Sequence, residues 1–496
     1  MAGRRRGGRP GVIDLGPRTT PAPAPLVEPG AGLVRVAVGG GLLVVAAAAA
    51  LLALGYPPVL ALGLLVGAPV ALAGAWLLHR RPELAAWAAV LVFSTSAELR
   101  LRLDPTIGVL KDALVGLLVV LALVAVRQRP STLRRLSPLA LPAAALAVLV
   151  GLYALDPAGA HGTSWIFGTR LLVEVLALLL AGALLAPRAT LVHLVRAMVV
   201  VLPFEAAFAW AQQIAGPASL IYGWWGYEYG SQVRSTSGGG VRTSGTFEDP
   251  FQLAALAVLG LALALFVASR WQAAVLIASA VAVLGATSVR TAMLQAGLLL
   301  VVYAVKRGFA REAAALGAVA AVAGVFFLAT TTSAVRPGAP EEPLLLTLNG
   351  RSDAWALAVD GWDSLVVGNG VGARGTGSTR TEVAVTGPPQ FDGSAPDAAF
   401  AGNPAFLDSS YAQVQSDVGI VGSAALLTAL AATAVFLVRR VRLDPTDGAA
   451  WAALGVLAVS VVDWIGRSSL ASYTTGFLTL YVLGVLLGAV RTQEQP

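Results

Sequence analysis

The chain has 496 residues, of which 57% are hydrophobic and only 12% are charged, and its formal net charge is +7 at pH 7. This composition is far from the average of soluble domains and indicates a membrane protein. The absence of cysteine excludes disulfides and thiolate metal sites. Because the apolar runs are continuous rather than alternating with polar residues, they predict helical spans and not a membrane β-barrel.

The first 32 residues are basic and rich in proline, with arginines at Arg4, Arg5, Arg6 and Arg9. The first apolar run follows too late for a cleavable signal peptide. We therefore predict a disordered cytoplasmic tail rather than a nucleic-acid-binding arm.

Long apolar segments then follow one another to the C-terminus, and roughly 20 apolar residues are enough for one helix to cross a bilayer. We predict an all-α fold, a polytopic transmembrane helical bundle of about 12–14 spans with a large, partly helical external loop. The candidate spans lie at approximately 33–54, 58–78, 84–97, 106–126, 138–155, 164–186, 190–213, 250–268, 272–288, 290–305, 312–331, 418–438, 449–466 and 470–490.

The distribution of basic residues predicts the orientation of these spans. With the N-terminus inside, the basic loops HRRP, RQRPSTLRR, SRWQ, KRGFARE and RRVRLDP all lie on the inner side, as the positive-inside rule requires. The positive net charge therefore reflects topology and needs no nucleic-acid partner. We predict a multi-pass protein of the cytoplasmic (inner) membrane, with both termini cytoplasmic and the active site on the external face.

Two segments on the predicted external side are longer than ordinary turns. The predicted organisation is a cytoplasmic tail (1–32), a transmembrane bundle (33–331) with an external loop at about 215–249, a large external loop (332–417), C-terminal transmembrane helices (418–490) and a second cytoplasmic tail (491–496). In the large loop, Trp355, Val359 and Trp362 recur at helical spacing and predict an amphipathic helix. The glycines that begin at Gly368 are expected to end it.

Three arginines are the candidate anion-binding residues. Arg242 precedes the span that begins near residue 250, Arg290 lies between two apolar runs, and Arg351 opens the predicted amphipathic helix. All three fall at the predicted outer face, and guanidinium groups bind phosphate oxygens with paired donors. Three of them converging on one site would suit a diphosphate. Each one taken singly is as well explained by snorkelling or a salt bridge.

The candidate base is Asp408 in the sequence FLDSSY, because a positioned carboxylate can take a proton from an acceptor hydroxyl. Its alternative role is a helix N-cap, which Ser409 or Ser410 could also fill. Tyr411 is predicted either to stack on a sugar or to anchor its helix at the membrane interface. Ser409, Ser410 and Tyr411 are thus candidate contacts for the acceptor or the sugar.

Several other charged residues fall inside the predicted spans. Glu205 has no partner nearby in sequence, so it is either a functional carboxylate that contacts the acceptor or a member of a cross-helix ion pair. The remaining embedded charges form pairs at i,i+4 spacing, which we interpret as neutralising one another. These pairs are Arg170 with Glu174, Asp463 with Arg467, and Glu98 with Arg102.

No sequence pattern predicts a metal or a cofactor. His79, His161 and His193 are far apart and lack metal-ligand spacing. The sequence GNGVG is rich in glycine, but no strand–helix unit surrounds it, which argues against a dinucleotide site.

Four motifs in fixed order carry a resemblance to a known family. RTSGTFEDPFQLA, TSVRTA, NGRSDAWALAVDGW with GNGVG, and LDSSYAQVQSDVGIVG lie between about residues 240 and 425. Their order resembles that of the O-antigen ligase and O-antigen polymerase family of polytopic membrane glycosyltransferases. Before residue 240 the chain resembles the family in hydropathy alone.

The resemblance implies transfer of a glycan from a polyprenyl-diphosphate-linked donor to an acceptor hydroxyl, without a metal. Arg242, Arg290 and Arg351 match the family arginines and would stabilise the diphosphate leaving group in an inverting displacement. Family ligases carry a histidine at the position of Asp408, in a pattern like HNSY. This departure favours a polysaccharide polymerase or a related transferase over a true ligase.

Two other functions remain open at this point. A lipid-linked glycan flippase or another transporter would fit the number of spans but has little need of a folded external loop with motifs. A polyprenyl-monophosphate-dependent sugar transferase usually has acidic residues in its first external loop, whereas that loop is only GYPP here.

Overall fold

A computed structural model of the chain divides into two compact units, Met1–Trp76 and Leu77–Pro496. Nearly all of the described residues belong to the second unit, and the predicted tail at 1–32 lies outside them. The structure describes residues 73–74, 76–102, 109–128, 130, 137–159, 162–185, 187–222, 234–235, 241–247, 250–309, 358–359, 361–374, 409–471 and 475–492.

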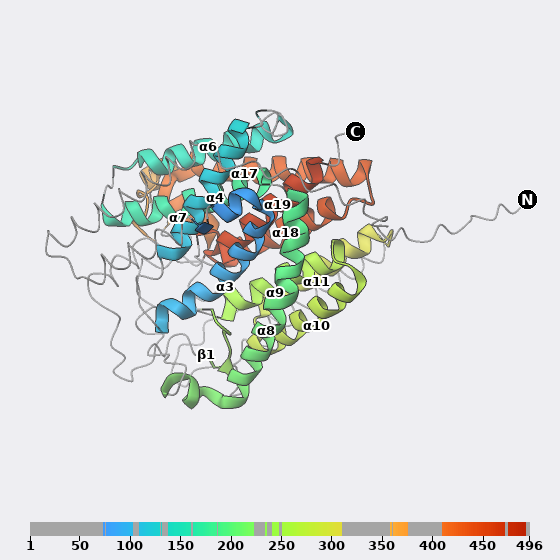
Figure 1. Cartoon of the computed structure of the whole chain (residues 1–496). Coiled ribbons are helices and arrows are strands. Elements are labelled where there is room, and N and C mark those ends of the chain that lie inside the picture. The colour runs from blue at the N-terminus through green and yellow to red at the C-terminus, as the bar shows by residue number, and fades with distance from the viewer. Residues whose placement is uncertain are drawn as a thin grey trace, which may run out of the picture. The chain divides into compact units, whose positions relative to one another are not determined.

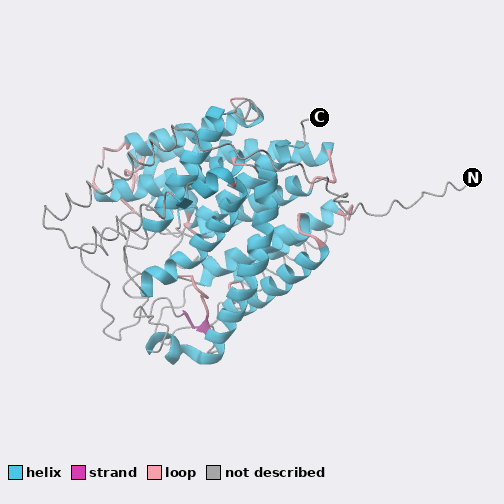
Figure 2. Ribbon diagram, viewed as in Figure 1, coloured by secondary structure: helices cyan, strands magenta, loops and turns pink. Residues whose placement is uncertain are grey.

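Helices make up almost all of the described chain (Figures 1 and 2). Two short strands, β1 (Arg234–Ser235) and β2 (Val241–Arg242), pair antiparallel with Arg234 opposite Arg242. The helices in chain order are η1 (Pro82–Leu84), α3 (Ala85–Arg102), α4 (Val109–Gln128), η3 (Ser137–Leu139), α6 (Ala140–Leu155), α7 (Thr163–Leu184), α8 (Pro187–Tyr222), α9 (Pro250–Phe266), α10 (Arg270–Thr287), α11 (Arg290–Lys306), α14 (Trp362–Val366), α17 (Ser410–Leu443), α18 (Gly448–Gly466), η5 (Ser469–Ala471) and α19 (Thr475–Thr492).

The helical character predicted from the apolar runs is confirmed. Five of the described helices are long and apolar enough to cross a membrane, and these are α7, α8, α10, α17 and α18. The candidate spans at about 250–268, 272–288 and 290–305 correspond to the separate helices α9, α10 and α11. The structure is thus compatible with a helical membrane protein, and the total of 12–14 spans stays a prediction.

Helix α19 packs against several other helices, among them α3, α7, α8, α9 and α18. Almost all of its described side chains are buried. Glycines allow its backbone to approach that of α7 closely: a Cβ atom added at Gly484 would collide with the carbonyl of Leu179, and one added at Gly182 would collide with the backbone of Tyr481. Small residues at such contacts are the usual means of close packing between membrane helices.

The helices that carry the first, second and fourth motifs meet at one end, which we call the motif end. It comprises the starts of α9, α11, α17 and α19 and the ends of α10 and α18. Ser410 at the start of α17 bonds to the carbonyl of Arg467 after α18, and Thr243 before α9 bonds to Ala286 near the end of α10. Segments far apart in the sequence are therefore neighbours here.

The opposite ends of the same helices form what we call the basic end. Lys306 at the end of α11 lies over the ring of Phe266 at the end of α9, with Nζ 5.3 Å from the ring centroid. Arg440 near the end of α17 pairs with Asp447 at the start of α18 at 3.4 Å. In the turn between these helices, the hydrogen bonds from Thr446 hold the pKa of the Asp444 carboxyl below its ordinary value.

Two helices extend into the segments predicted as external loops. Helix α8 has a break at Gly216, whose φ is 76°, near the predicted start of the loop at about 215–249, and helical residues continue to Tyr222. Helix α17 begins at Ser410, inside the loop predicted at 332–417. The non-helical residues Val418 and Gly419 inside α17 nevertheless fall at the predicted start of the next span.

The amphipathic helix predicted around Trp355 does not continue to Trp362. Gly361 adopts a left-handed φ of 92° and separates the turn at Val359 from α14, so Val359 and Trp362 do not lie on one continuous helix. Trp362 is 81% exposed. The part of this prediction that includes Arg351 and Trp355 lies outside the described residues.

Candidate functional site

Two of the three candidate arginines lie close together in the fold. Thr243 follows Arg242 directly, and its hydroxyl donates to the carbonyl of Ala286 at 3.2 Å while its backbone N–H points at the same oxygen at 3.5 Å. Ala286 is four residues before Arg290, which begins α11 after a left-handed turn at Ser288. Arg242 is half-buried and Arg290 is exposed. The chain therefore brings both arginines to the motif end, and their role in binding a diphosphate stays a prediction.

Helix α8 holds the segment that follows Arg242. Glu205 is fully buried, and its Oε2 accepts from the backbone N–H of Thr246 at 3.0 Å, while the Thr246 hydroxyl lies 2.5 Å from Oε1. Gln212, two helical turns later, donates to and accepts from the backbone of Gly245 at 2.9 Å in each case. Because Gly245 has a φ of 62° and its Cα faces Glu205, a side chain does not fit there. These contacts give Glu205 a place in the scaffold of the segment.

The start of α17 is bound tightly to the end of α18. Ser409 is the N-cap and accepts from Ala412, and its hydroxyl donates to the carbonyl of Trp464 at 3.0 Å. Ser410 donates its hydroxyl to the carbonyl of Arg467 at 2.8 Å and its backbone N–H to the same oxygen at 3.0 Å. Tyr411 donates to the carbonyl of Val461 at 3.2 Å and lies edge-on to Trp464.

These contacts decide one of the alternatives for the FLDSSY motif. The N-cap role belongs to Ser409, which leaves the base role of Asp408 as a separate question. Asp408 itself lies outside the described residues, as does Arg351. Their roles therefore stay predictions.

The ion pair predicted between Asp463 and Arg467 is present and belongs to a larger cluster. The Arg467 Nη1 lies 3.3 Å from the Asp463 Oδ1, and the same oxygen accepts from Gln295 on α11 at 2.8 Å. The Ser469 hydroxyl donates to the other oxygen of the carboxylate. A cavity of about 30 Å³ adjoins Gln295, Asp463 and Ser469, which is enough space for a water molecule. Sequence spacing could reveal the Asp463–Arg467 pair but not Gln295, which is 168 positions from Asp463.

The glycine-rich GNGVG segment has a structural partner in α17. Asp417 is fully buried and accepts from the Tyr153 hydroxyl at 2.9 Å and from the backbone N–H of Gly372 at 3.2 Å. The backbone N–H of Asn369 donates to the carbonyl of Ser416 at 2.5 Å. Gly368 and Gly419 both have left-handed φ values, and the backbones of the two segments touch at these glycines. The glycines of this motif therefore allow the loop to dock on the break in α17.

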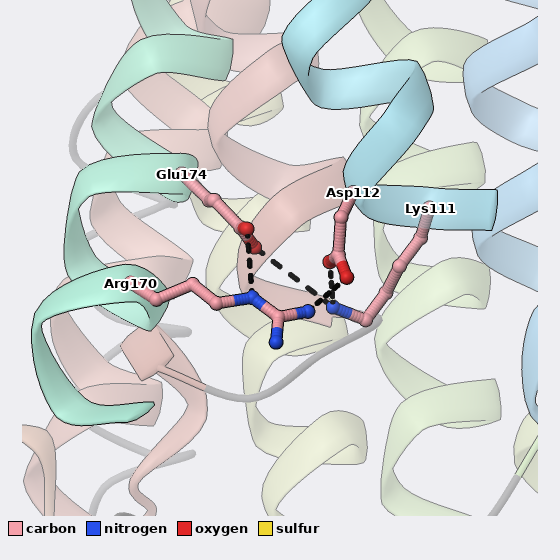
Figure 3. A network of polar contacts seen from close by, with 4 residues as sticks. All are labelled: Lys111, Asp112, Arg170 and Glu174. Carbon is pink, nitrogen blue, oxygen red and sulfur yellow. Dashed lines mark hydrogen bonds and ion pairs between the residues drawn. The ribbon is translucent and has the colours of Figure 1, made fainter. Parts of the chain in front are cut away.

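A charged network joins α4 to α7 (Figure 3). The Lys111 Nζ lies 2.5 Å from Asp112 and 3.8 Å from Glu174, and Arg170 pairs with Glu174 at 2.9 Å and also with Asp112. Lys111 in addition lies over the ring of Phe477 on α19, 5.1 Å from its centroid. The Arg170–Glu174 pair predicted from sequence is confirmed, but it is half of a neutral group of two cations and two carboxylates. The Glu98–Arg102 pair rests on side chains outside the described ones.

The motif end also offers an apolar groove. A groove of about 420 Å³ begins at Tyr411 and follows α17 past its break. Ile420 and Leu427 line it and are 51% and 55% exposed. Gln415 and Ser423, which bond to each other at 2.8 Å, add a polar element to the lining.

Comparison with known proteins adds no assignment. No protein-family model matches the chain, and no curated protein matches it. Among the described residues, no three histidine, cysteine or acidic side chains are grouped so that they could hold a metal ion. The case for a function therefore rests on the contacts of the residues themselves.

Proposed function

We propose that the protein is a membrane glycosyltransferase that moves a glycan from a polyprenyl-diphosphate-linked donor to an acceptor hydroxyl, in the manner of a polysaccharide polymerase. The observation that supports it best is the contact of Thr243 with Ala286. It brings the Arg242 segment against the end of the helix that precedes Arg290. Two guanidinium groups at one end of an apolar bundle suit an anionic leaving group at a membrane surface.

The proposed reaction, which the family resemblance implies, is a single displacement. The acceptor oxygen attacks the anomeric carbon, the bond from that carbon to the diphosphate oxygen breaks, and the departing diphosphate carries away the electron pair. Arg242, Arg290 and Arg351 stabilise the charge that develops on the leaving group. Asp408 takes the proton of the acceptor hydroxyl. The groove that begins at Tyr411 gives the polyprenyl chain an apolar path beside the charged site.

The test is glycan transfer by the purified protein in detergent, with a polyprenyl-diphosphate-linked glycan as donor and the same glycan as acceptor. Arg290→Ala is expected to lower the rate by about 100-fold or more, the usual effect of removing one group that stabilises developing charge. Asp408→Asn should also lose transfer. Arg442→Ala, which removes an exposed arginine at the basic end, should transfer at the wild-type rate.

The proposal fails if the wild-type protein transfers no glycan, or if Arg290→Ala is as active as Arg442→Ala. In the first case the same donor is placed in liposomes that contain the protein. Movement of the donor between leaflets without transfer would assign the protein to transport instead.

A further inference from the structure

Arg467 contacts two of the four motif segments and is linked to the helix that carries part of a third. Its guanidinium carbon lies 4.6 Å from the ring centroid of Phe251, in the RTSGTFEDPFQLA segment. Its backbone carbonyl accepts from Ser410, in the LDSSY segment. Through Asp463 it is linked to Gln295 on α11, the helix that begins with Arg290. Sequence spacing alone predicts only that Arg467 neutralises Asp463.

The packing of α11 against α18 places Arg467 at the level of Arg290. Gln295 bonds to Asp463, and a turn further into the bundle Leu299 lies against Gly455, so the two helices are antiparallel. At 1.5 Å per residue, Arg290 lies about 7.5 Å and Arg467 about 6 Å beyond the Gln295–Asp463 contact. Both displacements point toward the motif end. Two arginines on adjacent helices thus reach the same depth.

The hydrogen bonds of the cluster leave most of the Arg467 guanidinium available. Asp463 already accepts from Gln295 and Ser469, and its contact with Arg467 is single and 3.3 Å long. Charge-assisted N–H to carboxylate bonds are usually about 2.7–2.9 Å long and are often paired. A guanidinium has five N–H donors, and the other four have no hydrogen-bond partner among the described residues. The side chain is only 12% exposed, so an anion that reached it would be held in a largely desolvated place.

We propose that Arg467 is a further binding residue for the donor diphosphate, and that Asp463 is its positioning residue. This inference rests on the proposed function, because it takes the anion to be the diphosphate of the donor. Arg290 and Arg467 approach the diphosphate from neighbouring helices, so each phosphoryl group can meet its own guanidinium. Asp463 and the Phe251 ring fix the Arg467 side chain before the donor arrives, which reduces the entropy lost on binding.

Equilibrium binding of farnesyl diphosphate by the detergent-purified protein tests the inference. The loss of one charge-assisted contact should raise Kd between about tenfold and a hundredfold. We expect this for Arg467→Gln and for Arg290→Gln, and no change for Arg442→Gln at the basic end. Farnesyl monophosphate serves as the second ligand. Arg467→Gln should weaken the binding of the monophosphate less than that of the diphosphate, because the monophosphate has only one phosphoryl group. A residue with a purely structural role would affect the binding of both ligands equally.

Gel filtration and thermal unfolding show whether each variant is folded. If Arg467→Gln does not fold because Asp463 is left unpaired, the variant Asp463→Asn/Arg467→Gln removes both charges and is tested in its place. Wild-type affinity in that variant or in Arg467→Gln, together with weak binding by Arg290→Gln, would overturn the role of Arg467 and leave the proposed function standing. Absence of farnesyl diphosphate binding by the wild type would overturn both.

Discussion

At the scale of single residues, Glu205 is a fully buried carboxylate with partners on a distant segment of the chain. Its two oxygens face the backbone N–H and the hydroxyl of Thr246, four residues after Arg242. Burying a carboxylate in an apolar bundle is costly unless donors surround it. The Thr246 donors offset this cost, and the same bonds fix the segment that carries Arg242. The effect of Glu205 on the chemistry would then be indirect.

We predict that Glu205→Ala lowers the free energy of unfolding by about 1–3 kcal/mol, because it leaves the buried backbone N–H of Thr246 without its acceptor, while the Thr246 hydroxyl still has the carbonyl of Ser94 as an acceptor. Glu205→Gln keeps one acceptor and should cost less. The measurement is unfolding of the purified protein in mixed micelles, with glycan transfer measured on the folded fraction. A Glu205→Gln protein of wild-type stability that has lost transfer entirely would contradict the scaffold role and return Glu205 to the reaction.

At this scale, a contact can be predicted from sequence only when its two residues are close together along the chain. Arg170 with Glu174 and Asp463 with Arg467 are one helical turn apart, so spacing alone reveals them. Glu205 and Thr246 are 41 positions apart and belong to different elements. No local pattern can show such a contact.

At the scale of elements, the network of Lys111, Asp112, Arg170 and Glu174 ties α4 to α7. The Lys111 side chain is 6% exposed and Glu174 is 14% exposed, whereas Arg170 is 32% exposed. Charges in such a place are stabilising only while they balance, since one uncompensated charge costs more than the pair contributes. Removing any one of these four charged side chains should therefore loosen the packing of both helices.

We predict that Lys111→Met destabilises the protein by about 3 kcal/mol, because Arg170 alone then faces two carboxylates. The double variant Lys111→Met/Glu174→Gln restores neutrality, so the two changes should be non-additive by about 1–3 kcal/mol in a double-mutant cycle. Unfolding in mixed micelles gives the four free energies.

The control for this cycle is Arg440 with Asp444, an i,i+4 pair near the basic end whose acid is 38% exposed and whose closest atoms are 3.9 Å apart. Its coupling should not exceed about 0.5 kcal/mol. Equal coupling in the two cycles, or strict additivity in the first, would mean that the network does not act as a unit.

The elements themselves could be predicted from sequence more fully than their junctions. Continuous apolar runs indicated α9, α10 and α11 with ends within a few residues. The docking of GNGVG on the break of α17 could not be predicted, because it depends on left-handed glycines in both segments. Gly361 broke the predicted amphipathic helix for the same reason. An isolated glycine gives no sign in sequence of which φ it will adopt.

At the scale of the whole molecule, the contacts sort the helix ends into two groups. The motif end gathers Thr243 with Ala286 and Ser410 with Arg467. The basic end gathers Phe266 with Lys306 and Arg440 with Asp447. The positive-inside rule assigns these groups to opposite sides of the membrane. The packing shows which helix ends lie together, and the side of the membrane that each group faces stays a prediction.

We predict that the motif end faces the exterior and the basic end faces the cytoplasm. The chain contains no cysteine, so single cysteines can be introduced without removing any. Ala158→Cys and Ala373→Cys are in exposed turns. These turns contact each other, because the backbone N–H of Val371 donates to Asp156, and Gly372 bonds to Asp417 in the part of α17 toward the motif end. Phe309→Cys, at a residue that is 56% exposed, and Thr446→Cys report on the basic end.

A membrane-impermeant maleimide applied to intact spheroplasts should label the first two variants and leave the second two unlabelled until the membrane is permeabilised. Labelling of Phe309→Cys or Thr446→Cys in intact spheroplasts, with protection of Ala373→Cys, would invert the orientation. The arginines would then face the cytoplasm, where nucleotide sugars are available, and a polyprenyl-diphosphate-linked donor would no longer be the expected substrate. Labelling of one residue from each group on the same side would contradict the division into two ends.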